Sequence, residues 1–199
     1  MRSEFADFLV HSLPQEQDSP RNILDVGCGP GHLARLLARR NYQVAAVDRS
    51  ARLLRLARRW AISEIVKVDF QISPADSLPF PSRSFDACCA TTVIYFVQNP
   101  VQVLREMVRV TRPGGIIATL DPSSAMSVPA MREYALRHGL NARDRRKLHA
   151  WAIAAQFNRR FTEFELNSLL QSAGLLECLL QPKWDGLVWF ARAVVPTTL

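Results

Sequence analysis

Three glycines at a regular spacing mark the part of this sequence most suited to holding a ligand. The run Ile23-Leu-Asp-Val-Gly-Cys-Gly-Pro-Gly31 places Gly27, Gly29 and Gly31 directly after a short apolar stretch. A glycine turn between a strand and a helix lets a ligand approach the backbone closely, because no Cβ atom stands in the way. An acid, Asp25, lies two residues before the first glycine. The turn therefore combines close backbone approach with one negative charge.

The glycine spacing and the acid together indicate which ligand the turn favours. Dinucleotide sites usually read G-x-G-x-x-G, whereas the pattern here is G-x-G-x-G. A carboxylate at Asp25 would repel a pyrophosphate but attract the ammonium group of an amino acid. The helix that begins near Gly31 offers free N–H groups and the positive end of its dipole to a carboxylate. The turn therefore favours the methionine end of S-adenosyl-L-methionine (SAM) over a dinucleotide.

A second acid indicates a nucleoside beside that turn. Asp48 ends the next predicted strand, 21 residues after Gly27. A carboxylate at this place can accept hydrogen bonds from both ribose hydroxyls, and NAD sites use the same arrangement. Asp48 thus does not choose between SAM and NAD. An NAD-dependent dehydrogenase stays an alternative, which the glycine spacing and Asp25 disfavour.

Strands and helices that alternate along the chain position these residues. Short apolar runs predict five strands, and apolar residues at helical spacing predict the helices between them. Ser50 is the expected N-cap of the helix that follows Asp48. This alternation predicts a parallel sheet covered by helices on both faces, with right-handed crossovers. The predicted strands span 23–26, 43–47, 65–72, 85–92 and 116–120, and the other predicted helices span 4–13, 31–40 and 100–110.

The alternation stops after the fifth predicted strand. Residues 122–160 are expected to form extra helices rich in basic side chains, which would cover the substrate. Thr162 and Glu165 then form a capping box at the start of the next helix. The pair Asp185-Gly186 predicts a hairpin turn. The two strands around that turn are expected at 175–180 and 187–195.

Four segments match a known protein family in their order and spacing. They are ILDVGCGPGHLA (23–34), VAAVDRS (44–50), ADSLPFPSRSFDACCATTVIYF (75–96) and RVTRPGGIIATLDP (109–122). They resemble class I SAM-dependent methyltransferases of the small-molecule "methyltransferase 11" type, related to those of ubiquinone and menaquinone biosynthesis. The resemblance implies an α/β fold with a three-layer, Rossmann-like sheet of seven strands, mostly parallel with the last strand antiparallel, plus a helical lid insertion. It also implies transfer of a methyl group from SAM to a small-molecule acceptor by in-line displacement, with S-adenosyl-L-homocysteine as product.

The resemblance assigns cofactor contacts to residues at the ends of the predicted strands. Asp25 and the three glycines would contact the methionine part, and Asp48 would hold the ribose. Leu53 would pack beside the adenine, and Thr91 would border the sulfonium and the substrate. The full set of expected cofactor-binding residues is Asp25, Gly27, Cys28, Gly29, Gly31, His32, Asp48, Arg49, Leu53, Ala75, Asp76 and Thr91.

One position departs from the family pattern. The family usually has an acid here that receives the adenine amino group. When this sequence is aligned with the family on the Leu-Pro-Phe run at 78–80, Pro74 occupies the position of that acid. Proline has no acceptor side chain and no N–H. Either Asp76 replaces the acid, or the N–H of Ala75 and packing alone read the adenine. A lost charge-assisted hydrogen bond would weaken SAM binding about ten- to a hundred-fold, so a SAM-binding module without catalysis stays an alternative.

Few residues are needed for the chemistry itself. A methyl group on a sulfonium is already activated, so the protein must mainly align the reactants and exclude water. A general base is needed only for a hydroxyl or ammonium acceptor with a high pKa. The candidates are Tyr95, His138 and His149, each of which could instead be a packing or surface residue. No Ser-His-Asp arrangement and no metal site are found in the sequence.

Composition restricts the class of protein. With 199 residues, 48% hydrophobic and 22% charged, the chain is expected to be one globular domain over residues 1–199, with an N-terminal helix and linker over 1–20. It shows no signal peptide and no apolar run long enough to span a membrane. The four cysteines form no C-x-x-C pair, which favours reduced thiols and a cytoplasmic protein. These cysteines are Cys28, Cys88, Cys89 and Cys178. The protein is expected to be a monomer or a homodimer.

A net charge of +7, carried mainly by arginine, leaves further alternatives open. The basic segment 122–160 could be a solvated helical face, could bind a carboxylated or phosphorylated substrate, or could touch anionic lipid or nucleic acid. An RNA or protein methyltransferase is therefore an alternative function. The chain carries no appended RNA-binding domain and no N/D-P-P-Y motif, which disfavours a nucleic-acid partner.

Overall fold

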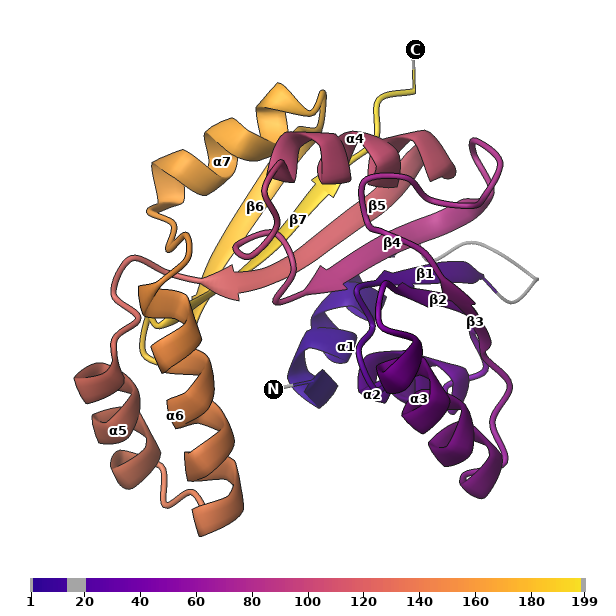
Figure 1. Ribbon diagram of the computed structural model, residues 1–199. Coiled ribbons are helices and arrows are strands. Elements are labelled where there is room, and N and C mark those ends of the chain that lie inside the picture. Colours follow the sequence, from indigo (N-terminus) through magenta and orange to yellow (C-terminus); the bar gives the residue numbers. More distant parts are fainter. Residues whose placement is uncertain (1, 14–20, 198–199) are drawn as a thin grey trace.

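A seven-stranded sheet forms the centre of the computed structural model, which describes residues 2–13 and 21–197 (Figure 1). The strands lie in the order β3-β2-β1-β4-β5-β7-β6. Strands β1 to β5 pair in parallel, and β7 is antiparallel to both of its neighbours. The bounds are β1 Asn22–Val26, β2 Gln43–Asp48, β3 Asp69–Ile72, β4 Phe85–Thr91, β5 Thr111–Pro122, β6 Leu176–Lys183 and β7 Val188–Val194.

This sheet confirms the predicted Rossmann-like α/β class, including the antiparallel last strand. Residues 85–90 of β4 are all buried, because a central strand of such a sheet is covered on both faces. The strand order reverses between β1 and β4, since the chain first runs outward through β2 and β3 and then returns. Open α/β sheets bind ligands at the carboxyl ends of the strands at this reversal. The fold therefore directs attention to the loops after β1 and β4.

Helices cover both faces of the sheet. Helices α1, α2 and α3 lie on one face, and α4 and α7 lie together on the other (Figure 1). The side chain of Ser50 caps α3, and Thr162 and Glu165 form the predicted capping box at the start of α7. The bounds are α1 Arg2–Ser12, α2 His32–Ala38, α3 Ala51–Ser63, α4 Pro100–Val110, α5 Val128–Arg137, α6 Ala142–Gln156 and α7 Glu163–Ser172.

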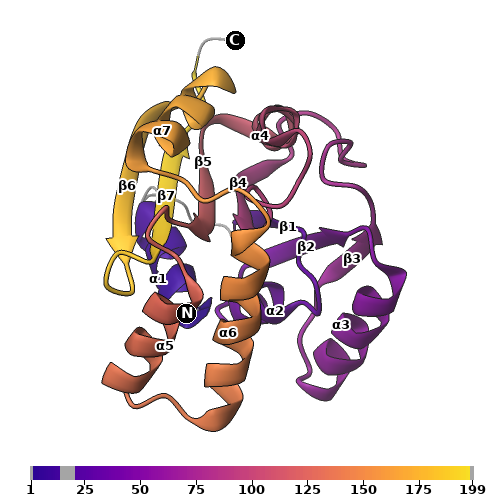
Figure 2. The same ribbon diagram turned by 60° about the vertical axis from the view of Figure 1, so that its left-hand side comes forward.

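The insertion between β5 and α7 is helical, as predicted. Helices α5 and α6 pack side by side and extend beyond the carboxyl ends of β4 and β5 (Figures 1 and 2). The two ends of the insertion are joined, because the N–H of Phe161 donates to the carbonyl of Pro122 at 3.0 Å and the N–H of Ser124 donates to the carbonyl of Phe161 at 2.8 Å. The insertion is thus a helical pair held at its base.

Two predicted strand starts were wrong by several residues. Strand β3 begins at Asp69 instead of residue 65, because Ile65 adopts a left-handed backbone (φ 54°) and ends α3. Its N–H donates to Ile62, and the N–H of Val66 donates to Ala61, the pattern of a Schellman C-cap. Strand β5 begins at Thr111 instead of residue 116, because the chain pairs with Phe85 directly after α4.

The turn of the final hairpin follows the prediction, but β6 continues to Lys183 instead of ending at residue 180. Trp184, Asp185 and Gly186 all have positive φ angles and form the turn between β6 and β7. The predicted linker that precedes β1 lies largely at residues 14–20, outside the described residues. Among the residues described, no helix has the length and apolar character of a membrane span, and no group of three or more His, Cys, Asp or Glu is placed to hold a metal ion.

Candidate active site

The glycine turn after β1 has a backbone that other residues would adopt only with strain. Gly27, Gly29 and Gly31 have φ angles of 65°, 55° and 69°. A Cβ atom on Gly31 would lie 2.9 Å from the ring of Phe70, and one on Gly27 would lie 2.4 Å from Val93. A Cβ atom on Gly29 would meet no heavy atom within 4 Å. The first and third glycines therefore allow close packing, and the middle one borders open space.

Asp48 ties the end of β2 to this turn. Its Oδ2 atom accepts a hydrogen bond of 2.8 Å from the N–H of Gly29, and its Oδ1 atom accepts one of 2.8 Å from the N–H of Ser50. A carboxylate has about four lone-pair positions, so two remain for further donors. The side chain is half-buried and lies in the wall of a cavity.

This cavity, of about 750 Å³, lies among the loops that follow β1, β2, β3 and β4. Its size is within the range of small-molecule sites. Expected cofactor residues in its wall are Gly27, Asp48, Arg49, Leu53, Ala75 and Asp76. Other wall residues include Ser50, Ser73, Pro74, Thr92, Val93, Phe96, Val97, Gln98, Asn99 and Val103.

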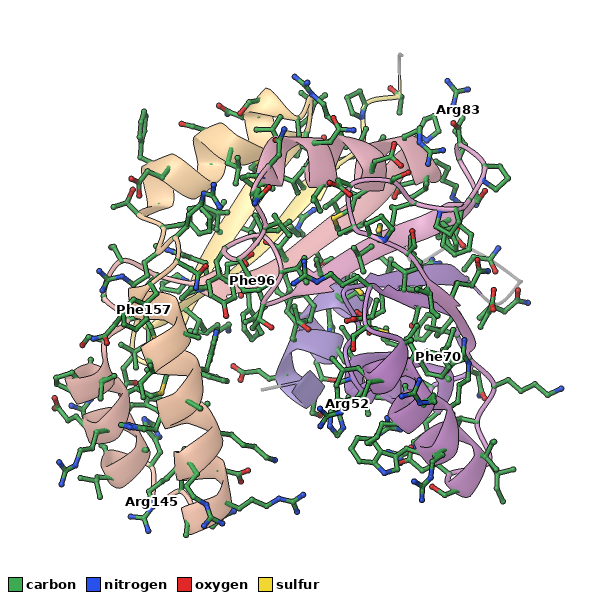
Figure 3. The ribbon with its side chains drawn as sticks, in the orientation of Figure 1. Arg52, Phe70, Arg83, Phe96, Arg145 and Phe157 are labelled. Carbon is green, nitrogen blue, oxygen red and sulfur yellow. The ribbon has the colours of Figure 1, made fainter. Side chains whose placement is uncertain are left out.

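Residues after β4 close one side of the cavity, and sequence reasoning missed most of them. Phe96 is half-exposed although it is a large aromatic residue, and Arg49 lies 5.8 Å from the centre of its ring. Figure 3 places Phe96 beside the carboxyl ends of β4 and β5. Thr92, with a left-handed φ of 60°, lies in the wall where Thr91 was expected. The sequence could have indicated this stretch through its position directly after a predicted buried strand.

The carboxylate of Asp25 lies behind the turn and not in the cavity wall. It is fully buried, and its Oδ2 atom accepts a hydrogen bond of 3.2 Å from the N–H of Ala34 in the first turn of α2. Cys28 and Gly31 belong to the same turn, where the N–H of Gly31 donates to the carbonyl of Cys28 at 2.9 Å. Burial raises the pKa of the Cys28 thiol, which therefore stays protonated. Asp25 therefore places a carboxyl group beneath the turn and fixes the start of α2.

The loop after β3 carries the departure from the family pattern. Pro74, Ala75 and Asp76 all lie in the cavity wall. The hydroxyl of Ser73 donates to the carbonyl of Ser77 at 2.7 Å and so shapes this loop. Asp76 is exposed, and within the described part of the chain no hydrogen bond or ion pair involves its carboxylate. An acidic acceptor is thus present in the wall, two residues after the proline.

The three candidate bases are not brought together, and none lines the cavity. Tyr95 is 6% exposed, and burial raises the pKa of its phenol. His138 lies at the end of α5, 3.2 Å from the carboxylate of Asp185 in the final hairpin. His149 is an exposed residue of α6. The contact with Asp185 therefore holds His138 at the final hairpin and not at the cavity.

A buried carboxyl that the sequence did not single out lies under Tyr95. Asp121 is fully buried near the end of β5, and its Oδ1 atom accepts a hydrogen bond of 3.1 Å from the N–H of Tyr95. Burial raises the pKa of Asp121 to about 7, although this backbone N–H opposes the shift. Asp121 thereby joins β5 to the loop that carries Phe96. The sequence could have indicated Asp121 as an acid at the end of an apolar strand.

A second cleft, of about 830 Å³, separates α6 from α2 and α3. His32, an expected cofactor residue, lies in this cleft, with its ring 5.1 Å from that of Trp60. Arg35 and Arg39 both pair with Glu64, at 2.8 and 2.7 Å. The glycine turn therefore borders two hollows, the cavity at Gly27 and this cleft at His32.

Comparison with known proteins agrees with this geometry. Residues 24–119 match a family described as a methyltransferase domain. The chain is 35% identical over 121 residues to a ubiquinone biosynthesis O-methyltransferase of Methylocella silvestris, a match that covers 57% of this chain and 47% of that protein. It is 33% identical over 157 residues to an uncharacterized methyltransferase of Schizosaccharomyces pombe, covering 68% and 56%. The chain thus spans about half the length of these curated relatives.

Solved structures share the fold over nearly the whole chain. A putative methyltransferase from Bacillus halodurans superposes with a TM-score of 0.70 at 17% identity, covering 98% of this chain and 99% of that one. Haemonchus contortus phosphoethanolamine N-methyltransferase 2, solved in complex with SAM, gives a TM-score of 0.73 at 14% identity, covering 97% and 52%. At these identities the likeness concerns the fold alone.

Proposed function

We propose that this chain, which belongs to the class I SAM-dependent methyltransferases, transfers a methyl group from SAM to a small-molecule acceptor. The observation that carries the proposal is the cavity beside the glycine turn, with Asp48 in its wall and hydrogen-bonded to Gly29. A carboxylate in this position suits a ribose, and the open space at Gly29 suits a ligand that lies against the backbone.

The residues of the cavity fit the parts of SAM in a defined order. The two lone-pair positions left on Asp48 would accept the ribose hydroxyls. Leu53 and Phe96, both partly exposed in the wall, would pack against the two faces of the adenine. Asp76 would accept the adenine amino group in place of the acid that Pro74 replaces, beside the N–H of Ala75.

The methionine end would lie along the glycine turn. The N-terminal end of α2 would offer the positive end of its dipole to the methionine carboxylate, and Asp25, ionised in the complex, would attract the ammonium group. Cys28, Gly31 and His32 shape the same turn. Thr91 and Thr92, at the end of β4, would border the sulfonium.

The acceptor would be a hydroxyl group. The curated relatives named as O-methyltransferases support this choice. SAM, when bound, supplies a methyl group that the acceptor oxygen takes by in-line displacement. The S–CH3 bond breaks to leave S-adenosyl-L-homocysteine, and the hydroxyl proton passes to bulk water. The chain's own residues would align the reactants and exclude water, with Phe96 and Val97 screening the cavity.

The surroundings in which the protein works are also a proposal. The described cysteines are all free thiols, and Cys28, Cys88 and Cys89 are buried, which supports a reducing compartment, the cytoplasm. We propose that no metal takes part and that the protein is a monomer or a homodimer.

Calorimetric titration with SAM and with S-adenosyl-L-homocysteine tests the function. We expect both to bind in the micromolar range with one site per chain. A folded sample that binds neither would refute the proposal. Binding of both without turnover of any hydroxyl acceptor would instead favour the SAM-binding module, the alternative that Pro74 keeps open.

A further inference from the structure

The cleft between α6 and the α2–α3 pair has a chemical character different from that of the cofactor cavity. It reaches about 830 Å³ and extends along α2 from His32, the residue after the glycine turn, to Arg39. His32, the first residue of α2, belongs to its wall. A molecule in this cleft would therefore lie next to the methionine end of the cofactor.

Basic side chains lie on both walls of the cleft. Arg35 and Arg39 of the α2 side face Arg143 and Lys147 of α6 across the hollow. The acids in the wall are Glu4, Glu64 and Asp144. Basic groups on both sides of a hollow concentrate anions within it, because their fields add between low-dielectric walls.

Two basic side chains of α6 point into the cleft and are available to a ligand. Within the described residues no carboxylate lies within ion-pair distance of Arg143. Lys147 has only a loose, exposed contact of 3.6 Å with Asp144. Exposed pairs of this kind contribute little, so a ligand anion could displace it at small cost. On the opposite wall Arg35 and Arg39 share the single carboxylate of Glu64, which leaves one positive charge uncompensated.

Aromatic residues also lie on both walls of the cleft. Tyr134 of α5 stacks on Trp184 of the final hairpin, with ring centres 5.7 Å apart and planes at 21°. Trp60 of α3 lies on the opposite wall and is 37% exposed. The indole N–H of Trp184 donates to Glu4 at 3.1 Å, which fixes that ring and puts a negative charge at the α1 end. An anionic group would therefore lie at the α6 end, away from Glu4.

We infer that this cleft binds the methyl acceptor and that the acceptor is a small aromatic anion carrying a carboxylate or phosphate group. Arg143 and Lys147 would bind the anionic group, and the ring would lie against Trp184 and Trp60. The inference rests on the proposed methyl transfer, because only that function makes the bound ligand a methyl acceptor. The binding of an aromatic anion can be measured by itself.

Tryptophan fluorescence gives that measurement, because Trp60 and Trp184 lie in the cleft wall. The probes are 3,4-dihydroxybenzoate and phenyl phosphate, each compared with a neutral partner, 3,4-dihydroxybenzamide and phenol. Titrations are run with and without S-adenosyl-L-homocysteine. We expect both anions to bind about tenfold more tightly than their neutral partners, as charge-assisted contacts predict. Equal binding of the anionic and neutral partners would overturn the inference.

Two double variants of α6 with the same change of charge locate the effect. Arg143→Gln with Lys147→Gln removes the cleft-facing pair, whereas Arg145→Gln with Arg146→Gln removes two exposed charges outside the cleft wall. Arg145 lies at the far end of α6 in Figure 3. We expect the first variant to weaken anion binding about tenfold and the second less than twofold. An equal loss in both variants would overturn the inference.

Two further measurements separate the remaining outcomes. The affinity for S-adenosyl-L-homocysteine should be the same in wild type and in both variants. If wild type binds the anions but not S-adenosyl-L-homocysteine, the proposed function is refuted and the anion site stands. Tight binding of a 20-nucleotide RNA with a steep salt dependence, reduced alike by both variants, would assign the charge to a polyanion surface and overturn the inference.

Discussion

The Oδ2 atom of Asp48 accepts a hydrogen bond of 2.8 Å from the backbone N–H of Gly29, so the end of β2 and the glycine turn after β1 act as one unit. The acid that would hold a ribose is thus positioned by the loop that would hold the methionine end. Rotation of the Asp48 side chain is restricted before any ligand arrives, because the N–H of Ser50 holds its other oxygen. Such preorganisation lowers the cost of ordering on binding.

The first prediction concerns this carboxylate. Asp48→Asn keeps one acceptor oxygen and replaces the other with an amide that repels the N–H of either Gly29 or Ser50. We expect the affinity for S-adenosyl-L-homocysteine to fall about ten- to a hundred-fold, the loss typical of a charge-assisted hydrogen bond. Calorimetric titration measures it. Asp69→Asn, an exposed acid on β3 outside the cavity, is the matched control and should bind as wild type does.

The second prediction asks which residue reads the adenine amino group. If Asp76 does so, wild type should bind S-adenosyl-L-homocysteine about tenfold more tightly than S-inosyl-L-homocysteine, whose base lacks that amino group. Asp76→Asn should lower the affinity for the adenosyl compound, so that both ligands bind with the same affinity. A variant that discriminates between them as well as wild type does would show that Asp76 plays no such part.

The third prediction separates the roles of two glycines. Gly31→Ala should destabilise the protein by about 2–4 kcal/mol, since a Cβ atom would press on Phe70 from a left-handed backbone. Gly29→Ala has the same backbone strain but no close neighbour, so we expect a loss of about 1 kcal/mol. Urea unfolding gives both values. Equal losses would contradict the assignment of Gly31 to packing.

The fourth prediction concerns the effect of Gly29→Ala on ligand binding, which should be large although its effect on stability is small. At Gly29 the added methyl group would project into the space where a ligand meets the backbone. Gly29→Ala should therefore weaken the binding of S-adenosyl-L-homocysteine more than its small effect on stability suggests. A folded Gly29→Ala protein with wild-type affinity would mean that no ligand approaches this residue.

Much of the fold could be predicted from the sequence, because local signals agreed with the tertiary structure. The run of buried residues in β4, the cap at Ser50 and the capping box at Thr162 depend on near neighbours in the chain. The start of β3 could not be predicted in this way. Ile65 is a β-branched residue of the kind that favours strands, but it adopts a left-handed conformation directly after Glu64, the C-cap of α3. Glycine or asparagine usually occupies that position.

The candidate site was predictable only where it follows strand ends. Asp48 and the glycine turn are positioned by β1 and β2, whose pairing in parallel brings their carboxyl ends together. Phe96 faces the cavity because of how the loop after β4 folds, and no periodicity indicates that direction. The placement of His138 depends on its contact with Asp185, 47 residues away in the chain, so sequence spacing could not exclude it as a base.

The last prediction concerns the buried acid under Tyr95. The pKa of Asp121 is raised from 3.8 to about 7 because burial disfavours the charged form. An acid whose pKa is higher in the folded than in the unfolded state stabilises the fold fully below the unfolded pKa, and this stability is lost as pH rises toward the folded pKa. The free energy of unfolding of wild type should therefore decline between pH 4 and pH 7 through this residue and change no further above that range.

Asp121→Asn removes this dependence and keeps an oxygen that can accept the N–H of Tyr95. Between pH 5 and pH 8 the variant should gain roughly 2–3 kcal/mol of stability relative to wild type, given about 1.4 kcal/mol for each pKa unit. Urea unfolding at several pH values measures the difference, in which all other titrating groups cancel. A difference that stays constant from pH 5 to pH 8 would mean that Asp121 is ionised throughout, with donors enough to hold its charge. In that case the loop carrying Phe96 would be anchored by a carboxylate at every pH at which the protein works.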